Sequence, residues 1–527
     1  MKVFEKIIRD KITAICRNKI NHEQHGFLPM KSCTTQIIPF IDSLTVTIND
    51  LSSTDVIYFD FAKAFDSVNH DIILHKLKHQ FHIDGLLLKF LVNYLKERKQ
   101  CVVIGGSRSS TLPVISGVPQ GSIIGPLLFV LFINDLPNCI TSGTNIALYA
   151  DDTKIWRKIN SEEDQIILQR DIDSLQAWSV TNKMKFHPKK CKALSVTICK
   201  KSYYILPFDR FAYCLDGIYL DYVETEKDLG VHVTSKLNFK EHIFYLCSKA
   251  NRMLGLVKRT CQFVKNPDRK RVLYLCLVSS QFNHCSPIWN PSSISLLNKI
   301  ERVQIKAIKW ILSEQCATYS RNEYFSKCKS LDLLPLKLRL DLFDILLFHK
   351  IIHKTISIEL PSYITLKRQT FLRSSLNDPY KFVSSIKPRI IIKNTTFPKT
   401  SSKKKKARVI TKKICKTKFN KKICKTKKVK NRKASRFFKK QMKQENIYGA
   451  EKDVTDEFSE DKVFANSYFY KTHIRWNYLP HELKTIEDYN KFKTKLEEYF
   501  WESILGCDKS MDQSCTSSDL SVNQYSI

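Results

Sequence analysis

The sequence has little glycine and proline, no closely paired cysteines and no long apolar run. With 13 Gly and 17 Pro in 527 residues, collagen, β-propellers and Gly-rich linker proteins are disfavoured. The 17 Cys include no C-x-x-C pair, so the spacing predicts reduced thiols rather than a zinc site. The longest apolar stretch, residues 126–133, is far shorter than the ~20 residues of a membrane span. No signal peptide precedes the first amphipathic pattern, so we expect an intracellular protein of the nucleus or cytoplasm.

Basic residues are in large excess. The chain has 87 Lys and Arg against 51 Asp and Glu, a net charge of +36, which indicates a polyanionic partner such as nucleic acid or an acidic membrane surface. Residues 399–443 contain 22 Lys or Arg and no acidic residue. Without this Lys-rich tract the net charge is +14, so a moderately basic body is combined with one very basic segment.

The hydrophobic pattern predicts a mixed α+β body followed by helices. Residues 1–50 have the pattern of helix, loop and helix, with the apolar residues of the first helix on one face. Residues 55–200 alternate short apolar runs typical of strands, one of them over 101–104, with amphipathic helices. Residues 216–236 predict short strands, after which apolar residues recur at helical spacing, with a last helical block from Leu331 to Ile352. Residues 467–500 predict a further folded segment.

Three aspartates interrupt the predicted strands. Asp60 follows an apolar run, and Asp151 and Asp152 lie at the bend of an apolar hairpin, which we expect to turn over residues 150–153. Taken singly, each has an ordinary explanation, because Asp is common in surface turns and beside helix or strand ends. If the two strands lie side by side, the carboxylates converge on a site of the kind that binds Mg2+ with substrate phosphates. Two such ions about 4 Å apart carry out two-metal phosphoryl transfer.

Longer motifs around these aspartates resemble those of reverse transcriptases in residue type, spacing and order. Phe59–Val68 resembles the first palm motif, Gly117–Phe129 the motif between, and Tyr149–Asp152 the Y-x-D-D box. The residues of these motifs are most similar to those of the jockey-like branch of non-LTR (LINE-type) retrotransposons. They resemble the motifs of telomerases and intron maturases less well. Further stretches that support this branch are His25–Pro29, Leu95–Gln100, Phe186–Lys192, Asp228–Val231 and Arg475–Pro480.

The resemblance implies an RNA-directed DNA polymerase with a right-hand fold, made of partial fingers, a palm with an antiparallel sheet, a helical thumb and a helical C-terminal region. Its partners would be an RNA template, a DNA primer and dNTPs, with no membrane; the oligomeric state is not indicated. The expected divisions are 1–54 (partial fingers), 55–215 (palm with fingers elements), 216–380 (palm–thumb hairpin and helical thumb), 381–445 (Lys-rich, disordered), 446–505 (C-terminal helices) and 506–527 (disordered tail).

The resemblance also implies a metal site. Asp60 and Asp151 would hold two Mg2+ ions, with Mn2+ as an alternative, and Asp152 would support the second ion more loosely. The backbone carbonyl of Phe61 would complete the coordination. Lys190 is placed like a lysine that protonates the pyrophosphate leaving group, although a lysine in a Lys-rich loop is equally well explained as a solvated charge.

Besides Phe61, four residues are implied in substrate binding. Phe65 occupies the position of an aromatic steric gate that favours dNTPs over rNTPs; its ordinary explanation is a core phenylalanine. Gln120 would contact the incoming nucleotide and template, and Gly121 would let the backbone approach closely. Tyr149 would pack beneath the primer end.

Two departures from the family leave alternatives open. The likeness begins abruptly, so we expect N-terminally truncated fingers without an upstream endonuclease domain, and Leu28 and Met30 stand where many relatives have Arg and Gly. These departures weigh against activity, and the alternative is a catalytically inactive remnant that binds nucleic acid.

The Lys-rich tract is not a family feature. It suits non-specific phosphate binding, nuclear import through residues 403–408, or a solvated segment with no role.

Overall fold

The structure is a computed structural model that describes residues 2–197, 211–315, 318–366, 382–385 and 463–505. The Lys-rich tract and the expected C-terminal tail lie outside the described residues. Helices surround one central sheet, which confirms the α+β class. No helix among the described residues is long and apolar enough to cross a membrane.

The elements up to residue 196 supply four of the five strands of the central sheet and helices around it. In chain order they are α1 (Lys2–Cys16), α2 (Cys33–Asn49), β1 (Ser53–Phe59), η1 (Ala64–Asp66), α3 (His70–His79), α4 (Gly85–Leu95), β2 (Lys99–Gln100), β3 (Val103–Ile104), β4 (Ser107–Arg108), β5 (Leu112–Pro113), α5 (Gly125–Phe132), η2 (Leu136–Cys139), β6 (Thr144–Tyr149), β7 (Asp152–Ile159), α6 (Glu162–Thr181) and β8 (Lys192–Val196).

The elements after residue 211 are short strands followed mainly by helices. They are β9 (Cys214–Leu215), β10 (Ile218–Tyr219), β11 (Asp221–Tyr222), β12 (Thr225–Asp228), β13 (Val231–Thr234), α7 (Lys240–Thr260), α8 (Pro267–Leu273), η3 (Tyr274–Val278), η4 (Ser279–Phe282), α9 (Ser286–Trp289), α10 (Ile294–Leu312), α11 (Arg321–Ser330), α12 (Leu336–Ile352), β14 (Ile364–Leu366), β15 (Phe382–Ser384), η6 (Phe464–Asn466), α14 (Tyr468–Tyr478), α15 (His481–Lys484) and α16 (Tyr489–Leu505). β15 lies within the segment that we expected to be disordered.

The central sheet has the strand order β11-β8-β1-β7-β6. β1 is its middle strand and pairs antiparallel with both β7 and β8, while β11 joins β8 in parallel. The register of β1 and β7 places Phe59 opposite Thr153. The end of β1 therefore meets the start of β7, which is the arrangement that convergence of the aspartates requires.

Both faces of the sheet are covered, which explains why β1 is apolar on successive residues. Val56 belongs to a core with α2 and the C-terminal helices, whereas Ile57 belongs to a core with α3, α5 and α6. α5 is buried along its whole length. Alternate side chains of one strand thus hold two layers of helices in place.

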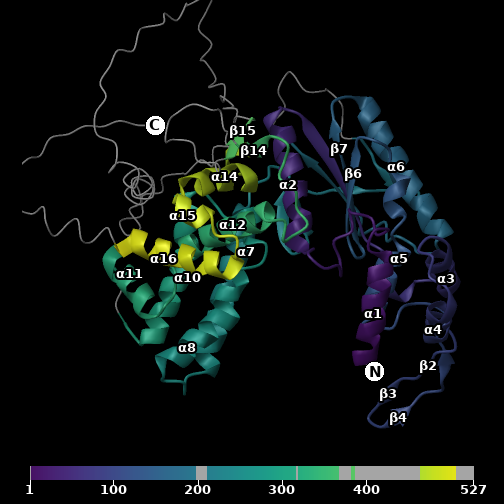
Figure 1. Cartoon of the computed structure of the whole chain (residues 1–527), viewed down its shortest axis with the longest axis horizontal. Coiled ribbons are helices and arrows are strands. Elements are labelled where there is room, and N and C mark those ends of the chain that lie inside the picture. Colours follow the sequence, from purple (N-terminus) through teal and green to yellow (C-terminus); the bar gives the residue numbers. More distant parts are fainter. Residues whose placement is uncertain (1, 198–210, 316–317, 367–381, 386–462, 506–527) are drawn as a thin grey trace, which may run out of the picture.

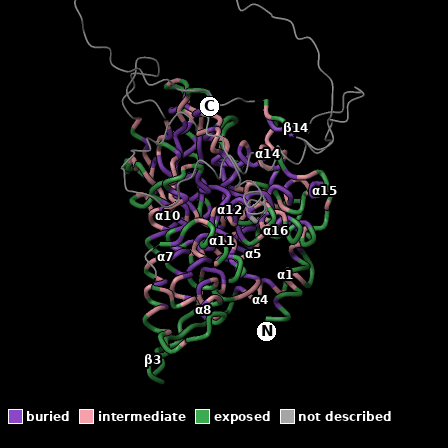
Figure 2. The backbone as a smooth tube through the Cα atoms, turned by 90° about the vertical axis from the view of Figure 1, so that its left-hand side faces the viewer, coloured by how far each residue is buried: buried purple, intermediate pink, exposed green. Residues whose placement is uncertain are grey.

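The helical half of the molecule has a core of its own. α7, η3, α10, α11 and the start of α12 share a third apolar cluster, and Figure 1 shows these helices grouped on the opposite side of α2 from α1, α3 and α4. The burial map in Figure 2 shows buried backbone through the middle of the molecule and exposed backbone at the β3 end. α2 therefore lies at the boundary between the two halves.

The C-terminal segment is joined to α12 by a buried ionic network. Arg475 lies with its Nη2 2.8 Å from the Asp341 Oδ1 and also pairs with Asp344, while the Lys471 Nζ is 3.5 Å from the Asp344 Oδ2. The side-chain amide of Asn290 donates to the same Asp344 oxygen at 2.8 Å. Two carboxylates and two cations balance one another, so this part of the chain is an integral part of the helical half.

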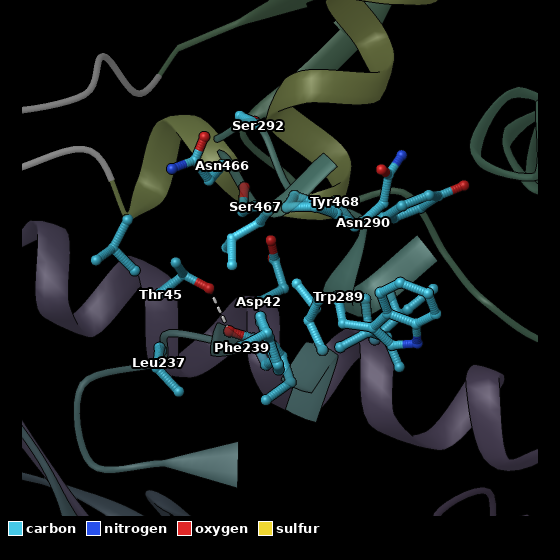
Figure 3. Close-up of a pocket in the computed structure, with 17 residues that line it drawn as sticks. Asp42, Thr45, Leu237, Phe239, Trp289, Asn290, Ser292, Asn466, Ser467 and Tyr468 are labelled. Carbon is cyan, nitrogen blue, oxygen red and sulfur yellow. Dashed lines mark hydrogen bonds between the residues drawn. The ribbon is translucent and has the colours of Figure 1, made fainter. Parts of the chain in front are cut away.

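A small cavity of about 50 Å3 lies beside α2 at this boundary. Figure 3 shows its lining from α2, from residues 237–243 and 288–296, and from the segment before α14. Asp42 of α2 accepts a hydrogen bond from the Tyr363 hydroxyl. Burial raises the pKa of the Asp42 carboxyl to about 7, and that hydrogen bond opposes the rise.

Three expected elements differ in detail. The apolar face of α1 is not all buried, since Ile12 is inaccessible but Ile7 is 61% exposed; periodicity identifies an apolar face without showing what covers it. The strand expected over 101–104 is reduced to the exposed β3–β4 hairpin. The helix expected from Leu331 begins at Leu336, immediately after Pro335, because proline fits the start of a helix but not its interior.

We predict that Arg475→Met strongly destabilises the protein. The substitution removes one cation and leaves buried carboxylates unbalanced, at a cost of roughly 3–5 kcal/mol. Chemical denaturation would measure the change. The control is Lys495→Met, because Lys495 and its partner Glu498 are half exposed, and such pairs contribute only about 0–1 kcal/mol. Equal denaturation midpoints for the two variants would contradict the stabilising role of the ionic network.

We also predict a pH-dependent contribution from Asp42. Because its folded pKa of about 7 exceeds the ordinary aspartate value of 3.8, the folded state binds the extra proton, and this contribution to stability falls as pH rises from about 4 to about 7. Asp42→Asn removes the charge. Thermal unfolding of both proteins across this range should show the wild type losing stability relative to the variant; a constant difference would refute the assignment.

Candidate active site at the ends of β1 and β7

The structure brings Asp60, Asp151 and Asp152 together at one edge of the sheet. Asp60 directly follows β1, and Asp152 is the first residue of β7, paired with Tyr149 across the hairpin. The turn consists of Ala150 and Asp151 alone, with Ala150 in the left-handed conformation (φ 55°). The expected turn over 150–153 is therefore too long by two residues, because cross-strand pairing continues to the Asp152 position.

The three carboxylates influence one another electrostatically. The pKa of Asp152 is raised to about 6, chiefly by burial and also by the charges of Asp151, Asp228 and Asp60. Burial also raises the pKa of Asp151, and the Asp60 charge adds to that rise. Negative charge is thus concentrated in a small region, although Asp152 remains exposed, and a nearby cation would stabilise it.

Asp60 is held by the loop that contains Lys190. The Asp60 carbonyl accepts a hydrogen bond from the His187 backbone N–H at 2.7 Å, and the Asp60 N–H donates to the Cys191 Sγ at 3.4 Å. The Lys190 Nζ lies 3.2 Å from the Asp60 Oδ2. Both side chains are substantially exposed, at 61% and 43%, so this ion pair is weak and separable.

The donor chemistry fits a divalent cation held by two carboxylates. The Asp60 Oδ2 is shielded from solvent and has no partner other than the Lys190 ammonium among the described residues. Mg2+ is commonly held by one or two carboxylates plus substrate phosphates. Among the residues that the structure describes, no group of three or more His, Cys, Asp or Glu side chains is arranged to hold a metal. The protein by itself therefore supplies an incomplete shell, which substrate oxygens would have to complete.

The remaining predicted residues surround the carboxylates at different depths. Phe61 is buried and stacks on Phe186, with ring centroids 4.4 Å apart. The half-buried Tyr149 has its pKa raised to about 12, chiefly by burial. Phe65 is partly buried and stacks on Phe129 of α5. Phe61 and Phe65 therefore pack against other aromatic rings, whereas Tyr149 is only half buried.

Gln120 and Gly121 lie on the exposed loop before α5. The Gln120 amide donates to the Asp66 Oδ1 at 2.8 Å. Gly121 has φ +79°, and nothing lies within 4 Å of the position that a Cβ would occupy. The open space beside this left-handed glycine leaves its backbone accessible to a ligand.

Gln24 supports the Ala150–Asp151 turn and was not identified from the sequence. Its Oε1 accepts hydrogen bonds from the backbone N–H groups of Gly26 at 2.7 Å and Ala150 at 2.9 Å. Gly26 is pressed so close to the turn that a Cβ there would lie 2.4 Å from the Ala150 nitrogen. The loop at residues 23–26 thus fixes the conformation of the turn that carries Asp151.

Lys154 is the second residue that sequence reasoning missed. Only 2% of its side chain is exposed. Its Nζ donates to the Gln36 Oε1 at 2.9 Å, pairs with Asp228 and lies 4.2 Å from the Phe40 ring centroid. Burial lowers the pKa of Lys154 and Asp228 opposes that fall. A lysine directly before the apolar pair Ile155-Trp156 of a predicted strand was the available signal.

The Lys154–Asp228 pair connects three elements beside the aspartates. Lys154 belongs to β7, Asp228 to β12 and Gln36 to α2, and all three line a cavity of about 290 Å3 together with Asp60 and Asp152. The β12–β13 hairpin is therefore attached to the strand that carries Asp152.

Comparison with known proteins agrees with this geometry. Residues 1–243 match the family described as reverse transcriptase (RNA-dependent DNA polymerase). These residues belong to the reverse transcriptase family. The match covers every aspartate of the site, and together with the mixed helix and sheet structure it confirms the expected right-hand polymerase fold.

Relatives of this chain include proteins of mobile elements. The chain is 26% identical over 334 residues to a probable RNA-directed DNA polymerase from transposon BS of Drosophila melanogaster, covering 61% of this chain and 36% of the relative. It is 26% identical over 326 residues to the RNA-directed DNA polymerase from mobile element jockey of Drosophila funebris, covering 59% and 34%. The chain thus spans about a third of the length of these curated relatives. The expected likeness to jockey-like elements is confirmed.

Among solved structures, the apo telomerase of Candida tropicalis is similar to this protein over 64% of this chain and 55% of that chain. The sequence identity is 10% and the TM-score is 0.35.

We predict that Lys154→Met destabilises the protein by roughly 3–5 kcal/mol, because it leaves Asp228 buried without its cation. Replacing both partners, as in Lys154→Met with Asp228→Leu, should recover much of that loss. Equilibrium denaturation would measure all variants. The matched control is Lys158→Met on the same strand, since Lys158 and its partner Asp50 are about 40% exposed (41% and 44%). A double variant no more stable than Lys154→Met would contradict the pairing.

Proposed function

We propose that this chain is an RNA-directed DNA polymerase of a non-LTR retrotransposon, which extends a DNA primer on an RNA template with dNTPs. The observation that carries the proposal is the meeting of Asp60 with Asp151 and Asp152, at adjoining ends of β1 and β7 within a reverse transcriptase domain. The raised pKa values of Asp151 and Asp152 support it, because perturbed carboxylates at one edge of a sheet are typical of functional sites.

In the proposed reaction, the primer 3′ hydroxyl attacks the α-phosphate of the dNTP and pyrophosphate leaves. Asp60 and Asp151 would hold two Mg2+ ions, or Mn2+, with Asp152 and the Phe61 carbonyl in support. The ions would neutralise the developing charge on the phosphate oxygens. Catalysis of this kind depends mainly on positioning and charge, so the tight support of the turn by Gln24 would contribute directly.

The other predicted residues receive roles that suit their positions. Phe65 would act as the steric gate beside the sugar, and Tyr149 would pack beneath the primer end. Gln120 and Gly121 would contact the nucleotide from the loop before α5. Lys190 would donate a proton to the pyrophosphate after separating from Asp60.

The proposed divisions are those expected from the sequence, with fingers over 1–54, palm over 55–215 and palm–thumb hairpin with thumb over 216–380. The ionic network of Arg475 supports treating the described C-terminal helices as an addition to the thumb. The role of the Lys-rich tract, and action in the nucleus or cytoplasm, stay predictions.

We predict that the wild-type chain extends an oligo(dT) primer on poly(rA) with dTTP and Mg2+, and that Asp151→Ala abolishes extension, because a metal-holding carboxylate is lost. Incorporation of labelled dTTP would measure both. The control is Asp173→Ala, which removes an exposed aspartate of α6 and should leave extension unchanged.

A catalytically inactive remnant would behave differently. It would retain the primer–template in a filter-binding assay but show no extension above the Asp151→Ala level. That result would overturn the proposed polymerase and favour nucleic-acid binding alone.

A further inference from the structure

An exposed aromatic residue lies next to the proposed steric gate. The Phe27 side chain is 54% exposed, and its backbone is left-handed, with φ 57°. This conformation is unfavourable for a bulky residue, and an exposed phenylalanine gains little from burial. Nothing about the stability of the loop by itself therefore accounts for a phenylalanine at this position.

The Phe27 ring contacts Phe65 edge to face. Their ring centroids are 6.1 Å apart with an interplanar angle of 85°. Phe65 also stacks on the fully buried Phe129 of α5, with ring centroids 4.4 Å apart and an interplanar angle of 23°. The Phe65 ring is thus held between a rigid helix and the Phe27 edge.

Phe27 is itself held in place by the loop beside the catalytic turn. Its neighbour Gly26 packs against the backbone of Ala150 and donates its N–H to Gln24. The preceding residue, His25, is hydrogen-bonded to the Thr35 hydroxyl at 2.9 Å. The backbone that carries the Phe27 ring is therefore held in place, so the ring can restrain Phe65.

We propose that Phe27 is a positioning residue that sets the sugar selectivity of the polymerase by restraining Phe65. This inference rests on the proposed function. A ring that excludes a 2′ hydroxyl discriminates only if it cannot tilt away when a ribonucleotide enters. Phe129 supports one face of Phe65, and Phe27 blocks the tilt on a second side, so deoxynucleoside triphosphates are preferred over ribonucleoside triphosphates.

The test compares kcat/KM for dTTP with that for UTP on the same primer–template, using the full chain. Phe27→Ala should lower the dTTP:UTP ratio roughly two- to tenfold, the size expected from losing one aromatic pair, with dTTP incorporation less affected than UTP incorporation. Phe27→Tyr keeps the ring edge and should retain the wild-type ratio. Phe27→Leu, which keeps an apolar side chain, should behave like Phe27→Ala.

Two further variants separate a specific restraint from general loosening of the loop. Met30→Ala changes another exposed, left-handed residue of the same loop (φ 62°, 49% exposed) and should leave the ratio unchanged. Phe65→Val should lower the ratio by itself, and adding Phe27→Ala to it should lower the ratio no further, because Phe27 acts through Phe65.

The outcomes distinguish this inference from the proposed function. A wild-type protein that incorporates neither nucleotide overturns the polymerase and the inference with it. An active wild type whose ratio is unchanged in Phe27→Ala, or falls equally in Met30→Ala, overturns the inference and leaves the polymerase intact.

Discussion

The pairing of β1 with β7 is the interaction on which the rest of the structure depends. It places the end of one strand beside the start of the other, so that carboxylates 91 positions apart in the chain (Asp60 and Asp151) meet at one edge of the sheet. The pairing is possible because each face of β1 is buried by a different layer of helices. A one-residue slip would exchange those faces, so the packing that stabilises the sheet also determines the geometry of the site.

Charge in the interior follows from the same arrangement. The aspartates are partly buried and repel one another, while Lys154 places a buried cation behind Asp152 and pairs with Asp228 on the next hairpin. A second balanced network around Arg475 attaches the C-terminal helices to α12. In both places a buried charge connects elements that are distant in the chain, because an unpaired charge there would be too costly.

The loop beside the site is held by close backbone contacts rather than by buried charges. Gly26 approaches the catalytic turn so closely that no side chain fits, and the adjoining Phe27 adopts a left-handed conformation while remaining half exposed. Strain of this kind persists only where surrounding contacts maintain it. The loop at residues 22–31 thus connects the support of the turn to the restraint of Phe65.

The sequence by itself determined the order of helices and strands, the α+β class and the identity of the candidate aspartates, because periodicity and motif wording are local properties of the chain. It did not reveal the roles of Gln24 and Lys154, since the neighbouring residues in the sequence do not show which distant groups a polar side chain will contact in the folded protein. Nor did it show that Ile7 of α1 would be exposed. Only the tertiary structure decided these points, because burial, pKa shifts and the contact of Phe27 with Phe65 arise from groups that folding brings together across long separations in the chain.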